Sequence, residues 1–205
     1  MPRTKEQYEQ IRREKRELIK QTALRLFAAK GYASTSISEI AKEATIAKGL
    51  LYNYYESKEA LLQTIWDELV ELFKNLIDPN HDGKVSDEEA ENFVDALFEL
   101  LKNNRDQMKL YYQCSFQPEV VEFLTKKFHL ERAVRLQAMI CNYFGNRLPF
   151  PSPAVGYFTV LTFLKGLSMV ITYTENVYTD EFLDEYKVYL KQILFNGINN
   201  NNNRI

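Results

Sequence analysis

One twelve-residue stretch carries the oxygen-bearing side chains that bind a hard divalent cation. Its sequence, DPNHDGKVSDEE, begins at residue 78 and fits the calcium-loop pattern D-x-[DN]-x-[DN]-G-x₅-E at every specified position. Side-chain oxygens would bind at loop positions 1, 3 and 5, a backbone carbonyl at position 7, and both oxygens of one carboxylate at position 12. The predicted ligands are Asp78, Asn80, Asp82, the carbonyl of Lys84, and Glu89.

The same stretch can be explained without a metal. Ser86 and Glu89 have the spacing of a capping box for a following helix, and Asp-Pro-Asn and Asp-Gly are common in turns. Calcium loops of the EF-hand type usually work in pairs, and the sequence contains one such loop. Two interpretations therefore stay open, a calcium-binding loop of the EF-hand type or a capped turn between two helices.

A second segment, residues 35–62, has residues that could recognise DNA. Its sequence is TSISEIAKEATIAKGLLYNYYESKEALL. Apolar residues at three- and four-residue spacing predict one short helix, capped by Ser36 or Ser38. A second short helix is predicted after a brief turn, and Leu51 and Tyr55 are expected to face the protein interior there. Two short helices joined by a tight turn form a helix-turn-helix, whose second helix enters the major groove of DNA.

The order of residues in this segment resembles one family. Ile-x-x-Ile-Ala-x-x-Ala, followed by Lys-Gly-x-x-Tyr-x-Tyr-Tyr-x-Ser-Lys-Glu-x-Leu, is similar to the DNA-binding segment of TetR-family transcriptional regulators. The resemblance covers about the first third of the chain. It departs at Thr45, where the family usually has glycine. Threonine disfavours a left-handed backbone, so this turn is expected to be slightly strained.

The resemblance implies an all-α fold in two domains. Residues 1–57 would form the helix-turn-helix DNA-binding domain, and residues 58–205 a helical ligand-binding and dimerisation domain. The implied function is a homodimeric repressor that a small-molecule effector releases from double-stranded operator DNA. A long helix over residues 58–77 would link the two domains, and the last two helices, near 154–175 and 180–197, would form the dimer interface.

Several side chains of the segment suit contacts with DNA. The amide of Asn53 can pair with adenine, and Leu50 could touch a thymine methyl group. Hydroxyls and N–H groups at a helix start suit a phosphate, and the resemblance implies backbone contacts for three residues, Lys48, Tyr52 and Lys58. The predicted DNA-contacting residues are Thr35, Ser36, Ala47, Lys48, Gly49, Leu50, Tyr52, Asn53, Tyr54 and Lys58.

Charge is distributed unevenly along the chain. The net charge of the whole protein is −2, but residues 1–60 carry a net +4 and the remainder a net −6. A basic N-terminal part concentrates attraction for phosphates where the helix-turn-helix is predicted. The excess is modest, so DNA affinity should depend on well-placed contacts more than on bulk charge.

The C-terminal two thirds of the chain are rich in aromatic residues. Aromatic side chains at helical spacing are more often core than binding site, yet a pocket lined by them would suit an apolar or aromatic effector. The candidate pocket residues are Tyr111, Phe116, Phe123 and Tyr157.

Composition and missing motifs restrict the other classes. The sequence contains no nucleophile elbow, glycine-rich phosphate loop, zinc-binding spacing or convincing acid–base pair, so we expect no enzyme and no required cofactor. We find no signal peptide and no apolar run near the roughly 20 residues of a membrane span, so a cytoplasmic protein without membrane contact is expected. The alternative function is a calcium-sensing helical protein in which the loop at 78–89 is the primary regulatory input.

Overall fold

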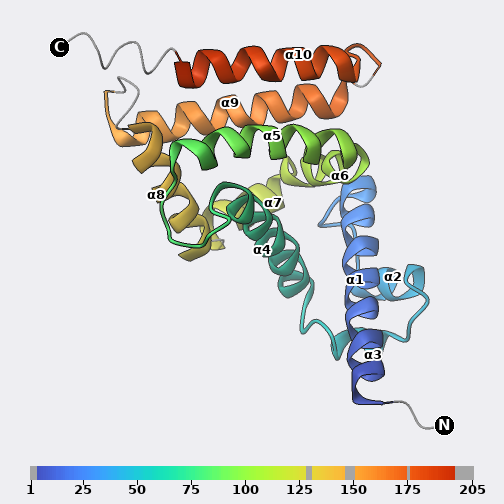
Figure 1. Ribbon diagram of the computed structural model, residues 1–205. Coiled ribbons are helices and arrows are strands. Elements are labelled where there is room, and N and C mark those ends of the chain that lie inside the picture. Colours follow the sequence, from blue (N-terminus) through green and yellow to red (C-terminus); the bar gives the residue numbers. More distant parts are fainter. Residues whose placement is uncertain (1–3, 128–130, 146–150, 175, 197–205) are drawn as a thin grey trace. The chain divides into compact units, whose positions relative to one another are not determined.

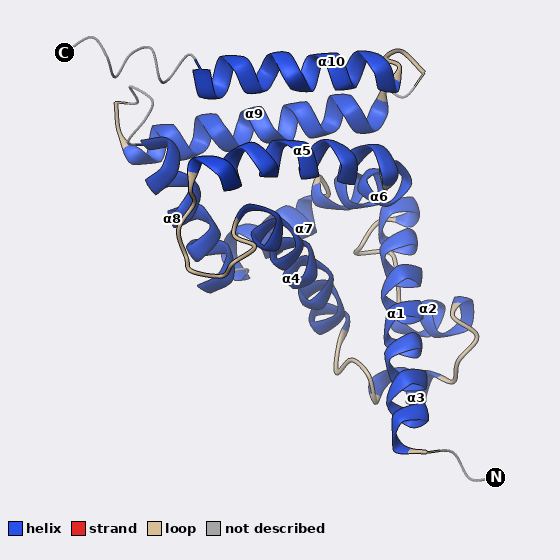
Figure 2. Cartoon of the chain, viewed as in Figure 1, coloured by secondary structure: helices blue, strands red, loops and turns tan. Residues whose placement is uncertain are grey.

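All regular elements in the described residues are helices (Figures 1 and 2). The computed structural model describes residues 4–127, 131–145, 151–174 and 176–196. The predicted all-α fold class is confirmed. Two compact units are present: a head unit, Met1–Glu68 with Leu110–Phe128, and a body unit, Leu69–Lys109 with His129–Ile205. These units do not test the predicted domain boundary at residue 57, which stays a prediction.

The head unit contains the predicted helix-turn-helix. Its helices are α1 (Lys5–Lys30), α2 (Ile37–Glu43), α3 (Lys48–Tyr52), the first half of α4 (Lys58–Ile77), the end of α6 (Arg105–Ser115), α7 (Pro118–Glu122) and a π-helical turn η1 (Phe123–Lys127). The first helix, α1, begins at Lys5. Thr4 caps it, because its side chain accepts from Gln7 N–H and its own N–H donates to the Gln7 side chain.

A single side chain joins the C-terminal end of α1 to the turn between α6 and α7. The Gln117 oxygen accepts from the Tyr32 N–H at 2.6 Å, and its nitrogen donates to the Phe27 carbonyl at 2.6 Å. Gly31 between them has φ +93° and ends α1. Gln117 therefore adds a second hydrogen bond to the Phe27 carbonyl, which also accepts from the Gly31 N–H, and pairs the Tyr32 N–H just beyond the helix.

The core of the head unit follows a helical periodicity. Leu18 of α1 lies outside this core and is 42% exposed. The fully buried side chains of this unit come from every helix of the helix-turn-helix and from α4. They include Ile19, Leu24, Phe27, Ile40, Leu51, Leu61, Leu62 and Ile65.

The body unit contains the end of α4, α5 (Asp87–Asn103), α8 (Glu131–Gly145), α9 (Pro153–Tyr173), α10 (Asp180–Lys191) and a π-helical turn η2 (Gln192–Asn196). α9 contacts α5 and α8, and α10 contacts α5. The helix expected near residues 180–197 extends past the described residues, which end at 196. A capping box of Ser86 and Glu89 starts α5, as its sequence spacing predicted.

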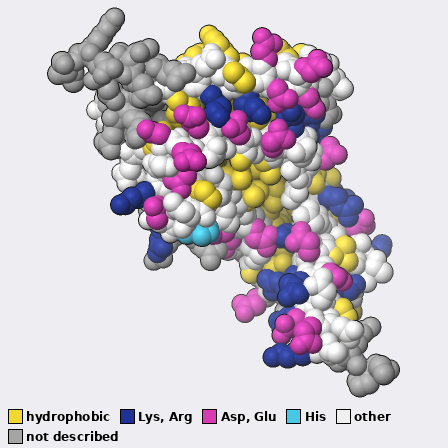
Figure 3. All heavy atoms as spheres, viewed as in Figure 1, with side chains coloured by type: hydrophobic (Ala, Val, Ile, Leu, Met, Phe, Trp, Pro, Cys, Tyr) yellow, Lys and Arg dark blue, Asp and Glu magenta, His cyan; other side chains and the backbone are white. Residues whose placement is uncertain are grey.

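The α10 helix is held against α5 and the first residue of α6 by a row of ion pairs. Four cations and four carboxylates pair at steps of three to four residues, three of the pairs with α5 and one with Arg105 of α6. Figure 3 shows Lys and Arg side chains alternating with Asp and Glu along this face. The Lys102 ammonium lowers the pKa of Asp184, and the bond to Asp184 raises the pKa of Lys102. The pairs are Lys191–Asp95 at 2.6 Å, Lys187–Glu99 at 3.8 Å, Lys102–Asp184 at 3.0 Å and Arg105–Asp180 at 2.9 Å.

We expected no apolar run long enough to cross a membrane, and this expectation is wrong for α9. Residues 154–173 form 20 residues of helix with a mean hydropathy of 1.6, which is sufficient by length and composition alone. One side of α9 packs on α5 and α8. Its opposite side leaves Phe158 70% exposed and Val170 47% exposed. The apolar composition of α9 therefore serves internal packing on one side and an uncovered surface on the other.

The turn between α2 and α3 has the strained backbone that its sequence predicted. Thr45 lies in the left-handed region with φ +55°. A left-handed conformation costs an L-residue about 1–2 kcal/mol, and glycine regains this at an entropic cost of about 0.5–1 kcal/mol. We expect Thr45→Gly to raise the free energy of unfolding by about 0.5–1 kcal/mol in urea denaturation. Thr45→Ala keeps the Cβ and should give a smaller gain, and a Thr45→Gly variant less stable than the wild type would contradict this explanation.

Candidate nucleic-acid interface

Helix α3 presents one face to solvent and packs the other into the head unit. Leu51 and Tyr55 are 0% and 4% exposed, which confirms that they face inward. A Cβ at Gly49 would meet no atom within 4 Å, so packing does not require a glycine there, and its small size leaves room for another molecule. The residues at 47–50, 52 and 53 are all exposed, namely Ala47, Lys48, Gly49, Leu50, Tyr52 and Asn53.

The start of α2 lies at the surface as well. Ser36 is the N-cap of α2, and its hydroxyl accepts a hydrogen bond from the Glu39 N–H at 3.2 Å. Of the two predicted capping residues, Ser36 is therefore the one that caps. It is exposed, and a helix start with accessible N–H groups attracts a phosphate.

Thr35 does not present its hydroxyl as predicted. The residue is 1% exposed, and its Oγ1 donates to the Gly31 carbonyl at 2.8 Å and lies 3.3 Å from the Leu26 carbonyl. The hydroxyl thus closes the turn between α1 and α2. The expectation of a side-chain phosphate contact at Thr35 is corrected, because a buried hydroxyl must satisfy its hydrogen bonds inside the protein.

The Lys58 ammonium is likewise occupied by the protein itself. Its Nζ donates to the carbonyls of Tyr32 at 2.8 Å and Thr35 at 3.0 Å, and lies 3.4 Å from the Ala33 carbonyl. It also lies 4.3 Å from the centre of the Tyr32 ring, and burial raises the pKa of Tyr32 to about 12. Lys58 therefore ties the start of α4 to the turn after α1, and its direct contact with the DNA backbone stays a prediction.

Tyr54 links α3 to α1 through its backbone. It is half-buried, and its carbonyl accepts from Arg16 Nη1 at 3.1 Å. The Arg16 guanidinium lies 4.8 Å from the centre of the Tyr55 ring, and the Tyr55 hydroxyl donates to the Arg16 carbonyl at 3.3 Å. These contacts hold the end of α3 against α1, so the exposed face of α3 is presented by a rigid support.

The loop at 78–89, in the body unit, forms a compact turn held by its own amides. Asp78 is 1% exposed, and its two carboxylate oxygens accept from the N–H groups of Asp82 at 3.1 Å and Gly83 at 3.2 Å. His81 and Gly83 both have a left-handed backbone, with φ +60° and +78°. The Asn80 oxygen accepts from Asp82 N–H at 2.9 Å. These bonds place the predicted ligands at positions 1, 3 and 5 in one tight turn.

The predicted cluster of calcium ligands is nevertheless not assembled. The Glu89 carboxylate accepts from the Ser86 N–H at 2.8 Å and from the Ser86 hydroxyl at 2.9 Å. Among the described residues, no group of three or more His, Cys, Asp or Glu side chains is arranged to hold a metal ion. The capping box therefore uses the carboxylate that calcium would need, and calcium binding requires that Glu89 leave Ser86.

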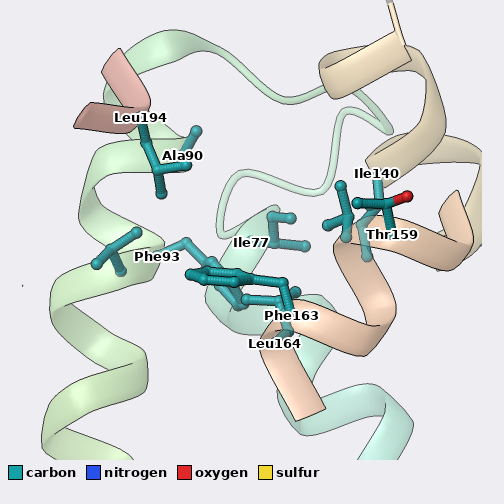
Figure 4. Close-up of a pocket in the computed structure, with 10 residues that line it drawn as sticks. Ile77, Ala90, Phe93, Ile140, Thr159, Phe163, Leu164 and Leu194 are labelled. Atoms are coloured by element: carbon teal, nitrogen blue, oxygen red, sulfur yellow. The ribbon is translucent and has the colours of Figure 1, made fainter. Parts of the chain in front are cut away.

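The body unit also contains an apolar pocket of about 250 Å³, formed by α4, α5, α8, α9 and η2 (Figure 4). None of the four predicted effector-pocket residues lines it. Tyr111 and Phe123 are buried in the head unit, and Phe116 is 63% exposed there, whereas Tyr157 lies in the body unit and is half-buried. The lining residues are Ile77, Ala90, Phe93, Val94, Ile140, Thr159, Val160, Phe163, Leu164 and Leu194.

Comparison with known proteins begins with the head unit. Residues 19–65 match the model of the tetR family of bacterial regulatory proteins. The uncharacterized HTH-type transcriptional regulator YerO of Bacillus subtilis is 37% identical over 109 residues, which are 52% of this chain and 38% of YerO. The icaADBC negative transcriptional regulator IcaR of Staphylococcus epidermidis is 28% identical over 127 residues, 60% of this chain and 65% of IcaR. The matches thus span less than two thirds of these relatives.

Solved structures extend the likeness of fold to most of the chain. NalD, described as the secondary repressor of the MexAB-OprM multidrug efflux pump in Pseudomonas aeruginosa, matches 87% of this chain and 94% of its own, with a TM-score of 0.59 at 16% identity. This coverage extends the likeness of fold well beyond the helix-turn-helix. Residues 19–65 therefore form a helix-turn-helix of the tetR type, and the all-helical fold of the chain is similar to that of NalD.

Proposed function

We propose that the protein is a cytoplasmic, homodimeric repressor that binds double-stranded operator DNA with α2 and α3. The exposed face of α3 carries this proposal, because it combines a cation at Lys48, an amide at Asn53 and an apolar contact at Leu50. These groups match a phosphate, an adenine edge and a thymine methyl group, respectively. The relative IcaR is described as a negative transcriptional regulator, which supports repression.

Dimerisation is supported by the uncovered apolar surface of α9 and α10. Apolar patches of this kind mark interaction sites in soluble proteins. Two copies would pair their heads for half-sites about one helical turn apart. The large exposed side chains on these two helices are Val155, Phe158, Phe163, Met169, Val170, Tyr173, Phe182, Val188 and Tyr189.

An effector that binds the body unit would control DNA binding through α4. This helix runs from Lys58, which holds the turn after α1, to Ile77, which lines the apolar pocket. An effector shifts the protein between two states only if it binds them with different affinity. An apolar or aromatic effector that prefers the state with low DNA affinity would release the operator.

Selection from genomic DNA fragments tests the proposed function. The purified protein should retain a small set of fragments that share an inverted repeat, with affinity that falls steeply as salt increases. Retention of all fragments equally, or affinity that does not depend on salt, would argue against operator recognition.

A second candidate function is calcium binding at the loop 78–89. It is favoured by the complete sequence pattern and by the tight turn that brings Asp78, Asn80 and Asp82 together. Bound calcium would draw Glu89 away from Ser86 and add its two oxygens to the site. Because the loop joins α4 to α5, calcium there would stiffen the far end of the helix that links the two units.

Calorimetric titration of calcium into chelator-treated protein tests this site. We expect saturable binding at micromolar to millimolar calcium, and at least a tenfold loss of affinity in Glu89→Gln. Glu88→Gln removes a neighbouring carboxylate that is not a predicted ligand, so it should bind calcium nearly as the wild type does. Absence of binding heat, or equal losses in both variants, would reduce the loop to a capped turn.

A further inference from the structure

We infer that the apolar pocket of the body unit is the effector site, and that its ligand is a small uncharged molecule with a hydrocarbon-like surface. This inference rests on the proposed function as an effector-controlled repressor. It goes further by assigning the site to residues absent from the predicted aromatic pocket and by excluding charged ligands.

The walls of the pocket come from the whole body unit. Ile77 is the last residue of α4, Phe93 lies on α5, and Phe163 lies on α9. Figure 4 shows these three side chains at the centre, with Ile140 and Thr159 to one side and Ala90 and Leu194 to the other. Ile77 is 2% exposed, whereas Phe163 is 40% exposed, so the pocket is deepest at the end of α4 and opens beside α9.

The side chains that line the pocket restrict its ligands to uncharged molecules. Nine of the ten lining side chains are hydrocarbon, and the tenth is Thr159. The Thr159 hydroxyl donates to the Val155 carbonyl at 2.8 Å, so its proton is already used within α9. None of the lining residues is ionisable. A carboxylate, phosphate or ammonium would therefore lose its water without gaining a partner.

The volume limits the size of the ligand. An apolar cavity of about 150 Å³ accepts benzene, and pockets for drug-sized molecules begin near 300 Å³. The volume of about 250 Å³ lies between these values. It suits a molecule of roughly ten heavy atoms, such as a two-ring aromatic compound.

Naphthalene and 2-naphthoate form a matched pair of probes, since they share the ring system and differ by one carboxylate. Binding is measured on the full-length protein without DNA, by calorimetry or by quenching of naphthalene fluorescence. We expect saturable binding of naphthalene and at least a hundredfold weaker binding of 2-naphthoate. Equal binding of the two probes, or no binding of naphthalene, would overturn the inference.

Substitutions in the lining test whether naphthalene binds in this pocket. Ala90 is 3% exposed and lines the pocket, so Ala90→Leu should fill it and weaken naphthalene binding at least tenfold. Glu91→Leu places the same side chain on the exposed side of α5 and should bind normally. Leu164→Ala enlarges the pocket and should admit anthracene, which keeps the test valid if Ala90→Leu does not fold. Normal binding in Ala90→Leu would place naphthalene elsewhere.

The same probes separate this inference from the proposed function. If naphthalene binds in the pocket and leaves operator affinity unchanged, the assignment as the effector site is wrong. If another compound releases the operator while Ala90→Leu has no effect on its action, the proposed function stands and the pocket assignment is overturned.

Discussion

Replacing Lys48, Tyr52 and Asn53 by alanine should abolish specific operator binding while leaving the fold intact. All three side chains are exposed on the face of α3 opposite the buried Leu51. Loss of a base-edge contact costs about 1–3 kcal/mol of binding free energy. Each lost phosphate contact reduces the slope of log K against log salt concentration by about one. The triple variant should therefore bind the operator about a hundredfold or more weakly in gel-shift assays.

A control variant distinguishes recognition from general charge. Lys126→Ala removes one cation of the head unit at a side chain that is 72% exposed and pairs only weakly with Glu122. It should bind the operator almost as the wild type does, and both variants should keep the wild-type melting temperature. Operator affinity that survives the triple replacement would show that another surface contacts DNA.

The second large effect is expected from Phe158→Glu, which should convert the proposed dimer into a monomer. Phe158 is 70% exposed on α9, within the surface proposed to contact the second copy. A glutamate there would have to be buried without a partner in the dimer, at a cost of several kcal/mol. Analytical ultracentrifugation should show a monomer at micromolar concentration, and operator affinity should fall because each monomer reads one half-site.

Phe116→Glu is the matched control for this experiment. Phe116 is 63% exposed and belongs to the head unit, so the same substitution introduces the same charge away from α9 and α10. It should remain dimeric. A dimeric Phe158→Glu, or a monomeric Phe116→Glu, would move the interface away from α9.

The local features of the helix-turn-helix could be predicted from its sequence. Apolar spacing identified the inward side chains Leu51 and Tyr55, and the departure at Thr45 identified a left-handed turn. The bounds of α4 agree with the helix expected over residues 58–77, and α5 starts at the predicted capping box. These features depend on residues a few positions apart, so a single sequence contains the information.

Features that depend on distant residues could not be predicted in this way. The bonds of Lys58 and Thr35 join different turns, and Gln117 reaches α1 across some ninety positions. The sequence shows that a lysine or threonine is present at a position where the resembled family contacts DNA. It does not show whether the side chain binds DNA or a backbone carbonyl of the protein. The pocket was missed for a similar reason, because its aliphatic lining resembles ordinary core. Ala90, a small residue in the otherwise bulky buried face of α5, was the one available signal.

The contacts that hold α10 against α5 leave the outer surface of α10 free to change during evolution. Its inner side is held by the buried Leu183 and Leu190 and by ion pairs to α5, so the exposed apolar residues on its outer side are not needed to keep it in place. Mutations can therefore change which copies associate without unfolding the subunit that carries them. After a gene duplication, two daughter proteins could stop forming mixed pairs through a few outward substitutions, and each could then evolve its own operator and its own inducer.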